Sequence, residues 1–172
     1  MLTERPTNTS SHRRLALPVV MFAAVSLLNE ISAQMVAPLI PILIAAVLSA
    51  GPVAVGVVEG CADAVAAFLK LWSGRRADVR PERRKAMVVA GYGLALVSRP
   101  LIGLASSWGA VVALRSADRL GKGLRGAPRD AILADATPVG WRGRAYGLNR
   151  GMDYAGAVIG TLVAAAALPG GT

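Results

Sequence analysis

The chain has 172 residues, of which 54% are hydrophobic and only 17% are charged, and its formal net charge is +9. Soluble domains are about 45–50% apolar and about 25% charged, so this composition argues against one and is typical of packed membrane helices. The basic residues lie at the ends of apolar runs, as membrane topology signals do, which indicates a lipid bilayer rather than nucleic acid as the partner. A single cysteine, Cys61, excludes a disulfide framework within the chain.

The first apolar segment, residues 15–48, follows a polar and basic stretch at residues 1–14 that we expect to be a cytoplasmic tail. One span needs about 20 apolar residues, so two spans and a turn do not fit into this segment. The segment therefore predicts one long helix that is tilted or kinked, with Pro38 and Pro41 as the kink or the exit. Glu30 lies near its middle, and an ionisable residue inside a span is a functional candidate by default.

Basic residues are distributed unevenly between the connections. The turns at 49–52 and 106–109 contain no Lys or Arg, whereas the tail, the loop at 74–85 and the region 122–144 hold most of them. The positive-inside rule then predicts a cytoplasmic N-terminus, an extracytoplasmic end at 169–172 and five spans in the plasma (inner) membrane. The four spans after the first are expected at about 53–72, 86–106, 108–132 and 145–168.

A charged stretch follows the apolar residues 108–114 and has apolar runs on both sides. Its charged side chains recur three or four residues apart, which places most of them on one stripe of a helix. A charged stripe is costly in lipid, so it is expected to face protein, water or a partner. The members of this stripe are Arg115, Asp118, Arg119, Lys122, Arg125, Arg129 and Asp130.

Polar and ionisable residues also lie in or near the other spans. Acids and bases occur in similar numbers, as expected if they pair across helices. Two roles stay open: pairing that fixes or gates the helices, and direct contact with a substrate or a proton. Glu30 is the first choice for a proton, because it lies deepest and a carboxylate in low-dielectric surroundings holds a proton more readily. The candidates for a substrate or proton pathway are Asn29, Glu30, Glu59, Asp63, Arg99, Arg115, Asp118, Arg150 and Asp153.

The segment from Gly121 to Gly126 fits the pattern G-x-G-x-x-G. A dinucleotide site would require a strand before these glycines and a helix after them. The preceding run is long and rich in alanine, and no alternation of strands and helices occurs in the chain. We therefore interpret the glycines as positions of close helix packing and expect neither a cofactor nor a metal.

Several motifs together resemble the major facilitator superfamily. The segment from Gly74 through Asp78 to Arg83 and Arg84 is similar to the loop signature G-x-x-x-D-R-x-G-R-R between that superfamily's second and third helices. Val79 stands where an Arg is usual in the signature. The resemblance implies that Gly74, Asp78, Arg83 and Arg84 belong to a cytoplasmic gate.

Five further features strengthen the resemblance. Arg115 stands at the position of a buried Arg in the superfamily's fourth helix. The block 118–135, with D-R-L-G-K-G-L-R-G-A-P-R-D-A, closely resembles a bacterial subgroup. That subgroup pairs the block with N-E in helix one (29–30), E-G-x-A-D-A in helix two (59–64) and R-x-M-D-x-x-G-A in helix five (150–157).

The resemblance implies an all-α integral membrane protein whose five helices form part of a six-helix N-terminal bundle. Members of the superfamily are secondary transporters with twelve helices in two halves, and their substrate lies near the midplane between the halves. This implies ion-coupled or proton-coupled transport of a small solute of unknown identity. A missing C-terminal half would come from the same gene or from a second chain. Thr161 stands where antiporters often have a Pro, which weakens an antiport reading.

Two alternatives stay open. The first is a truncated membrane protein that does not transport, because one half of the pathway cannot offer alternating access. The second is a small membrane-embedded enzyme of phospholipid synthesis, because Gly74, Asp78 and Glu82 are spaced like the end of its metal-binding array. The leading Asp pair and Arg of that array are missing, and a two-metal site needs several convergent carboxylates. The only histidine, His12, lies in the tail, so we do not expect an enzyme.

Overall fold

The computed structural model describes residues 17–44 and 51–167. Within these ranges the chain is helical and has no strand, which confirms the expected all-α class. Five long helices are connected by short segments. In chain order the elements are α1 (Leu17–Val36), α2 (Leu39–Ile42), α3 (Pro52–Val79), the 3-10 helix η2 (Pro81–Arg83), α4 (Arg84–Ile102), α5 (Trp108–Asp135), the 3-10 helix η3 (Val139–Trp141) and α6 (Arg142–Ala167).

The first apolar segment is divided at the predicted position. α1 ends at Val36, a turn follows at Ala37 and Pro38, and the short α2 begins at Leu39. Proline has no backbone N–H to continue the helix, which explains the break. The predicted tail at 1–14, the last residues of the first span and the end at 169–172 lie outside the described residues.

The connection between α3 and α4 is shorter than the sequence predicts. The loop expected at 74–85 is wrong in its first half, because α3 continues through the arginine-rich segment to Val79. Arg and Ala are good helix formers, so a basic sequence beyond the apolar run does not end the helix. Pro81 ends it instead, since the residue before a proline is biased away from helical dihedrals, and Arg80 has φ −132° and ψ 76°.

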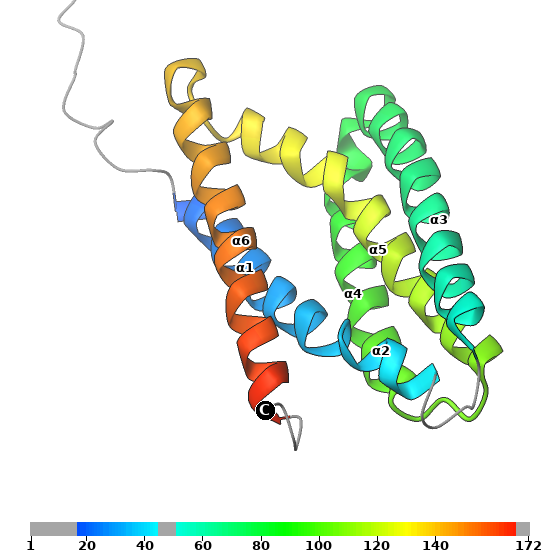
Figure 1. The fold of residues 1–172 in the computed structure, drawn as a ribbon. Helices are drawn as coiled ribbons and strands as arrows, with labels where there is room; N and C mark the ends of the chain where they lie inside the picture. Colours follow the sequence, from blue (N-terminus) through cyan, green and yellow to red (C-terminus); the bar gives the residue numbers. More distant parts are fainter. Residues whose placement is uncertain (1–16, 45–50, 168–172) are drawn as a thin grey trace, which may run out of the picture.

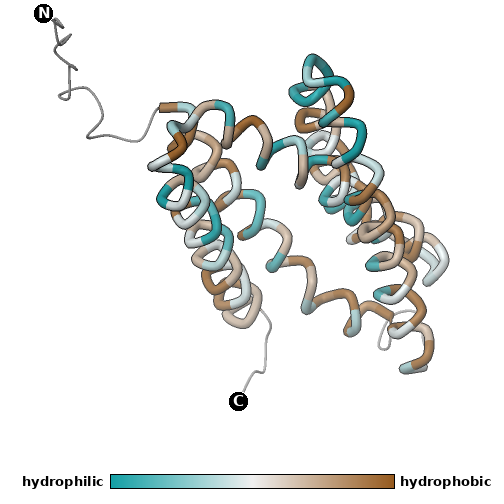
Figure 2. The backbone as a smooth tube through the Cα atoms, turned by 90° about the horizontal axis from the view of Figure 1, so that it is seen from above, coloured by the Kyte–Doolittle hydropathy of each residue, from teal (hydrophilic) through white to brown (hydrophobic). Residues whose placement is uncertain are grey.

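The long helices pack in two groups. α1 packs against α6, while α3 and α4 both pack against α5. In Figure 1 the first group lies on one side and the second on the other, and the C-terminal half of α5 extends toward α6. Figure 2 shows the same two groups from above, with hydrophilic residues recurring along helices that are otherwise hydrophobic.

Glycines permit the closest contacts within each group. A Cβ built on Gly160 of α6 would lie 2.5 Å from the carbonyl oxygen of Ile31 in α1. A Cβ on Gly121 of α5 would lie 2.5 Å from the carbonyl oxygen of Gly91 in α4. Because a carbonyl of a neighbouring backbone cannot move aside as a side chain can, these positions need a residue without a Cβ.

Two apolar clusters connect the groups at opposite ends. One consists of Ile40, Ile44, Val58, Ile102 and Val111, from the α2 region, the start of α3, the end of α4 and the start of α5. The other consists of Val19, Leu133 and Ala145, from the start of α1, the end of α5 and the start of α6. On α5 the buried charged residues, from Arg115 to Arg129, therefore lie between Val111 of one cluster and Leu133 of the other.

Among the described residues, three segments are long and apolar enough to cross a membrane: Leu17–Ile42, Pro52–Val79 and Pro81–Ile102. α5 and α6 have 28 and 26 residues, so at about 1.5 Å per residue they are long enough to span the hydrocarbon core, but they carry more charge. Large apolar side chains such as Phe68, Leu71 and Leu162 are exposed on the helix surfaces. The count of five spans stays a prediction.

Candidate functional site

A polar cavity of about 440 Å³ lies between α1, α3, α5 and α6. We call it the polar cavity throughout. Its lining contains six basic and three acidic side chains, and its volume is within the range of small-molecule sites, about 300–1,000 Å³. The charged and amide side chains that line it are Asn29, Glu30, Gln34, Lys70, Arg119, Lys122, Arg125, Arg129, Asp130, Arg150 and Asp153.

Glu30 lies in the polar cavity and has a basic partner. Lys122 Nζ lies 3.3 Å from Glu30 Oε1 and 3.4 Å from Oε2, and Gln34 Nε2 donates to Oε1 at 3.2 Å. Glu30 is only 8% exposed, whereas the Lys122 side chain is 47% exposed. The carboxylate is therefore held inside the protein, and its cation reaches it from the open part of the cavity.

A second set of ion pairs joins α3 to α5. Arg115 donates to both carboxylate oxygens of Glu59, through Nε at 3.0 Å and Nη2 at 3.2 Å. Such two-point pairing fixes both position and orientation. Arg119 also reaches Glu59 at 3.5 Å, and its Nε lies 3.6 Å from Asp63 Oδ1. Glu59 and Asp63, both candidates for the substrate or proton pathway, thus meet the charged stripe of α5.

A third set is buried between α4, α5 and α1. Arg99 Nε donates to Asp118 Oδ1 at 2.9 Å, and Arg99 Nη1 donates to the carbonyl oxygen of Asn29 at 2.8 Å. Arg115 Nη1 lies 3.7 Å from Asp118 Oδ2. All three charged side chains are at most 8% exposed, so this set works in a low-dielectric interior, where each charge needs its partners.

A fourth set connects α5 to α6 and α1. Arg129 pairs with its neighbour Asp130 at 3.2 Å and with Asp153 at 3.6 Å, while Arg150 reaches Asp130 at 3.5 Å. Arg129 Nη1 also donates to Ser26 Oγ at 2.9 Å, and Ser26 lies 3.2 Å from Asn149 Oδ1.

Ser26 and Asn149 belong to this network, although neither residue was predicted from the sequence as part of the site. Ser26 lies four residues before Glu30 in the first apolar segment, and Asn149 directly precedes Arg150. Residues four positions apart share one face of a helix, so the spacing of Ser26 and Glu30 was a usable signal.

Comparison with known proteins identifies the family of this chain. The family model described as Major Facilitator Superfamily matches residues 22–171. The chain belongs to the Major Facilitator Superfamily. An uncharacterised MFS-type transporter of Methanocaldococcus jannaschii is 35% identical over 154 residues, which is 90% of this chain and 38% of that protein. Uncharacterised proteins of Mycobacterium bovis and Mycobacterium tuberculosis are 38% identical over 150 residues, 87% of this chain and 36% of theirs.

The chain therefore spans less than two fifths of the length of these relatives. No solved structure matches it with significance. Membership of the Major Facilitator Superfamily makes the chain a multi-pass membrane protein of a transporter family, whose apolar helix faces contact the lipid bilayer. Members of this superfamily are transporters and not enzymes.

The residues expected at the superfamily's cytoplasmic gate lie at the end of α3 and the start of α4. Gly74 and Asp78 are part of α3 itself. A Cβ built on Gly74 would lie 3.6 Å from the Cβ of Ala127 in α5, and Asp78 is exposed. Arg84 donates to Asp135 Oδ2 at 2.6 Å, and Arg83 is exposed. Among the described residues Asp78 has no ion pair, so its gating role stays a prediction.

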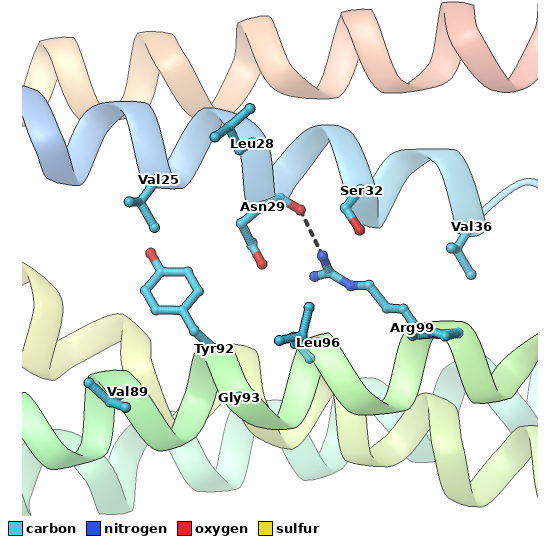
Figure 3. A pocket seen from close by; sticks show the side chains of 12 residues that line it. Val25, Leu28, Asn29, Ser32, Val36, Val89, Tyr92, Gly93, Leu96 and Arg99 are labelled. Carbon is cyan, nitrogen blue, oxygen red and sulfur yellow. Dashed lines mark hydrogen bonds between the residues drawn. The ribbon is translucent and has the colours of Figure 1, made fainter.

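An apolar groove of about 750 Å³ lies on another side of α1, between α1 and α4. Figure 3 shows Tyr92 and Arg99 directed from α4 toward α1, with the Arg99 hydrogen bond to Asn29 at the middle of the groove. Arg125 of α5 lies over the Tyr92 ring at 4.7 Å from its centre and donates to the Gly91 carbonyl at 3.4 Å. Arg125 is thus part of the packing between α4 and α5.

The G-x-G-x-x-G segment lies in the middle of α5, and within the described residues no strand precedes it. A Cβ on Gly121 would collide with α4, and one on Gly123 would lie 2.8 Å from the Ala66 carbonyl oxygen in α3. The interpretation of these glycines as packing positions is confirmed for Gly121 and Gly123, but it is wrong for Gly126, whose Cβ would meet no atom within 4 Å. Among the described residues no three His, Cys, Asp or Glu side chains gather closely enough to hold a metal ion.

Proposed function

We propose that a protein built from this chain and a second helix bundle moves a small solute across the plasma membrane by secondary active transport. The second bundle comes from the same gene or from another chain. The observation that carries this proposal is the polar cavity, whose charged side chains project from four helices of a chain that is otherwise apolar on its outer faces. Charged residues inside a membrane protein mark pathways for solutes or ions.

The position of the polar cavity supports a solute pathway. Lys122 lies 14 residues from the start of α5 and 13 from its end, so at about 1.5 Å per residue it is about 20 Å from either end. Apolar clusters connect the two helix groups near both ends of the bundle. Transporters bind their solutes near the membrane midplane, where access alternates between the two sides.

Coupling to an ion or a proton is part of the proposal. Glu30 is buried, and Lys122 is its basic partner at 3.3 Å. Removing Lys122 from Glu30 would leave an isolated buried carboxylate, which is costly and favours uptake of a proton. The opening of this one pair is therefore the step at which coupling would occur.

Alternating access is tested without a known solute by cysteine labelling of the full-length gene product. Ala67 lines the polar cavity on α3, and Phe68 next to it is 70% exposed on the outer face. All native cysteines, including Cys61, are replaced by Ser, and a single Ala67→Cys is introduced. A membrane-impermeant maleimide should label this cysteine both in right-side-out and in inverted vesicles.

Phe68→Cys is the matched control, because its thiol faces lipid and should be labelled from neither side. Labelling of Ala67→Cys from one side only would reject alternating access and favour the non-transporting alternative. The mass of the native polypeptide, detected with an antibody to residues 74–85, decides whether the second bundle is in the same chain. A band near 17.7 kDa would assign it to another chain or remove the transport proposal.

The gate is tested in the same labelling assay. Asp78→Asn removes an exposed charge at the cytoplasmic end of α3, and we expect it to change the ratio of labelling from the two sides at Ala67→Cys while insertion stays normal. Glu82→Gln in η2 is the control, since it removes a nearby exposed charge outside the motif. An unchanged ratio with Asp78→Asn would reject a gate at this position.

A further inference from the structure

More basic than acidic side chains line the polar cavity, and the basic side chains differ in how closely they are paired with other groups. Arg125 and Arg129 are buried and take part in helix packing, through the Tyr92 ring and the Gly91 carbonyl in one case and through Ser26 and two carboxylates in the other. Arg150 shares those two carboxylates. The remaining basic residues of the lining are Lys70, Arg119 and Lys122.

These three cations are weakly neutralised. Lys70 is exposed and forms no ion pair with any described residue. Arg119 has only long contacts, 3.5 Å to Glu59 and 3.6 Å to Asp63, and its Nε is buried without a hydrogen-bond partner in the described structure. Glu59 is already bound at two points by Arg115, so it is a poor partner for a second guanidinium.

Lys122 has one carboxylate partner, Glu30, yet nearly half of its side chain is exposed to the polar cavity. The ammonium group can therefore turn toward a molecule in the cavity without moving the backbone. Other charged groups line the same cavity as Glu30. They are Lys70 on α3, Arg119, Arg125, Arg129 and Asp130 on α5, and Arg150 and Asp153 on α6. Arg99 of α4 binds the carbonyl of Asn29, the residue before Glu30.

We infer that the polar cavity binds a small oxyanion, held through its carboxylate or phosphate oxygens by Lys70, Arg119 and Lys122. Charge-assisted hydrogen bonds from Arg and Lys are the strong contacts that such oxygens make. The anion competes with Glu30 for Lys122. This names the solute class of the proposed transporter and so rests on the proposed function.

The competition gives a specific expectation. Lys122→Gln removes a cation from the site and should weaken anion binding about tenfold to a hundredfold, because it removes a charge-assisted hydrogen bond. Glu30→Gln removes the competitor and should strengthen it. Two neutralising substitutions on one ion pair are therefore expected to act in opposite directions, which a merely structural pair would not do.

The test uses charged thiol reagents on Ala67→Cys in the full-length gene product with its other cysteines removed. The rates of an anionic sulfonate and a cationic trimethylammonium methanethiosulfonate are compared, and their ratio is normalised to that at Ser106→Cys in the uncharged turn. A positive cavity should favour the anionic reagent at Ala67→Cys by about tenfold, in line with electrostatic focusing in clefts. Lys122→Gln should lower this preference and Glu30→Gln should raise it.

Lys85→Gln is the matched control, since this exposed lysine at the start of α4 lies outside the polar cavity. Protection of Ala67→Cys from labelling by inorganic phosphate assigns a phosphate-like ligand, and protection by succinate assigns a carboxylate. Equal rates for the two reagents, insensitivity to Lys122→Gln, or protection by neither anion would overturn the inference. Labelling from both sides with no charge preference would overturn the anion site and leave the transport proposal supported. Labelling from one side only, with protection by an anion, would reject transport and leave the anion site supported.

Discussion

Arg99 and Asp118 form a buried ion pair whose removal should destabilise the bundle strongly. Arg99→Met leaves Asp118 with only the 3.7 Å contact to Arg115 and removes the hydrogen bond to the Asn29 carbonyl, the main polar link from α4 to α1. Breaking a buried pair costs about 3–5 kcal/mol. Because Arg115 compensates Asp118 in part, we expect the lower value, about 3 kcal/mol, or more than a hundredfold in the unfolding equilibrium.

The measurement is unfolding of the full-length gene product by SDS in mixed micelles, followed by circular dichroism. Asp118→Leu alone should cost a similar amount, because it leaves the Arg99 guanidinium buried with a carbonyl as its only partner. The double variant Arg99→Met with Asp118→Leu should lose less than either single variant, about 1 kcal/mol for the hydrogen bond to the Asn29 carbonyl, since no unpaired charge remains between the two positions. Arg83→Met, on an exposed arginine of η2, is the control and should change stability by less than about 0.5 kcal/mol.

Additive losses in the double variant would refute this reasoning. They would mean that the two side chains stabilise the bundle independently, and that the short Arg99–Asp118 distance of 2.9 Å does not reflect an energetic pair. A negligible loss in Arg99→Met would show that water reaches the interior between α4 and α5, which contradicts the burial of both side chains.

Three further predictions concern packing and topology. Gly160→Ala should destabilise the protein by about 1–3 kcal/mol in the same unfolding assay, because its Cβ would lie 2.5 Å from the Ile31 carbonyl oxygen. The control Gly151→Ala, whose Cβ meets open space, should be neutral or stabilising, and equal effects of the two substitutions would contradict the contact. Arg84→Met should cost less than about 1 kcal/mol despite its 2.6 Å ion pair, because the Asp135 carboxylate is 68% exposed; a larger loss would show a tighter pair than exposure allows. Arg80→Cys should react with an impermeant maleimide only in inverted vesicles, whereas labelling in right-side-out vesicles would reverse the predicted topology.

Sequence patterns predicted the helices well, because long apolar runs leave few alternatives. They failed at the end of α3, where Arg75 and Arg76 look like a loop by charge but continue the helix beyond the apolar run. Composition shows where a helix leaves lipid, and only a local breaker such as Pro81 shows where it ends.

The charged stripe of α5 was predicted from spacing, but its partners were not. Which acid meets which base depends on the relative positions of helices, so Lys122 with Glu30 and Arg99 with Asp118 required the three-dimensional arrangement. Ser26 was not predicted, because an uncharged hydroxyl in an apolar run can also bond to the backbone of its own helix, whereas in the structure it accepts a hydrogen bond from Arg129. Spacing shows which face of a helix is polar, and packing decides what that face binds.

The pairing of α1 with the last helices of the chain also has a consequence for biosynthesis. Lys122 is made 92 residues after Glu30, so at about 5–20 residues per second the carboxylate waits about 5–20 seconds for its cation. During that time α1 must enter the membrane without α5 or α6. One acidic residue costs about 2.5–3.5 kcal/mol at the centre of a span, and several Leu, Ile, Val and Phe residues, at about −0.3 to −0.6 kcal/mol each, are needed to offset it. The high mean hydropathy of Leu17–Ile42, 1.6, therefore allows Glu30 to enter the membrane with α1 before α5 and α6 have been synthesised.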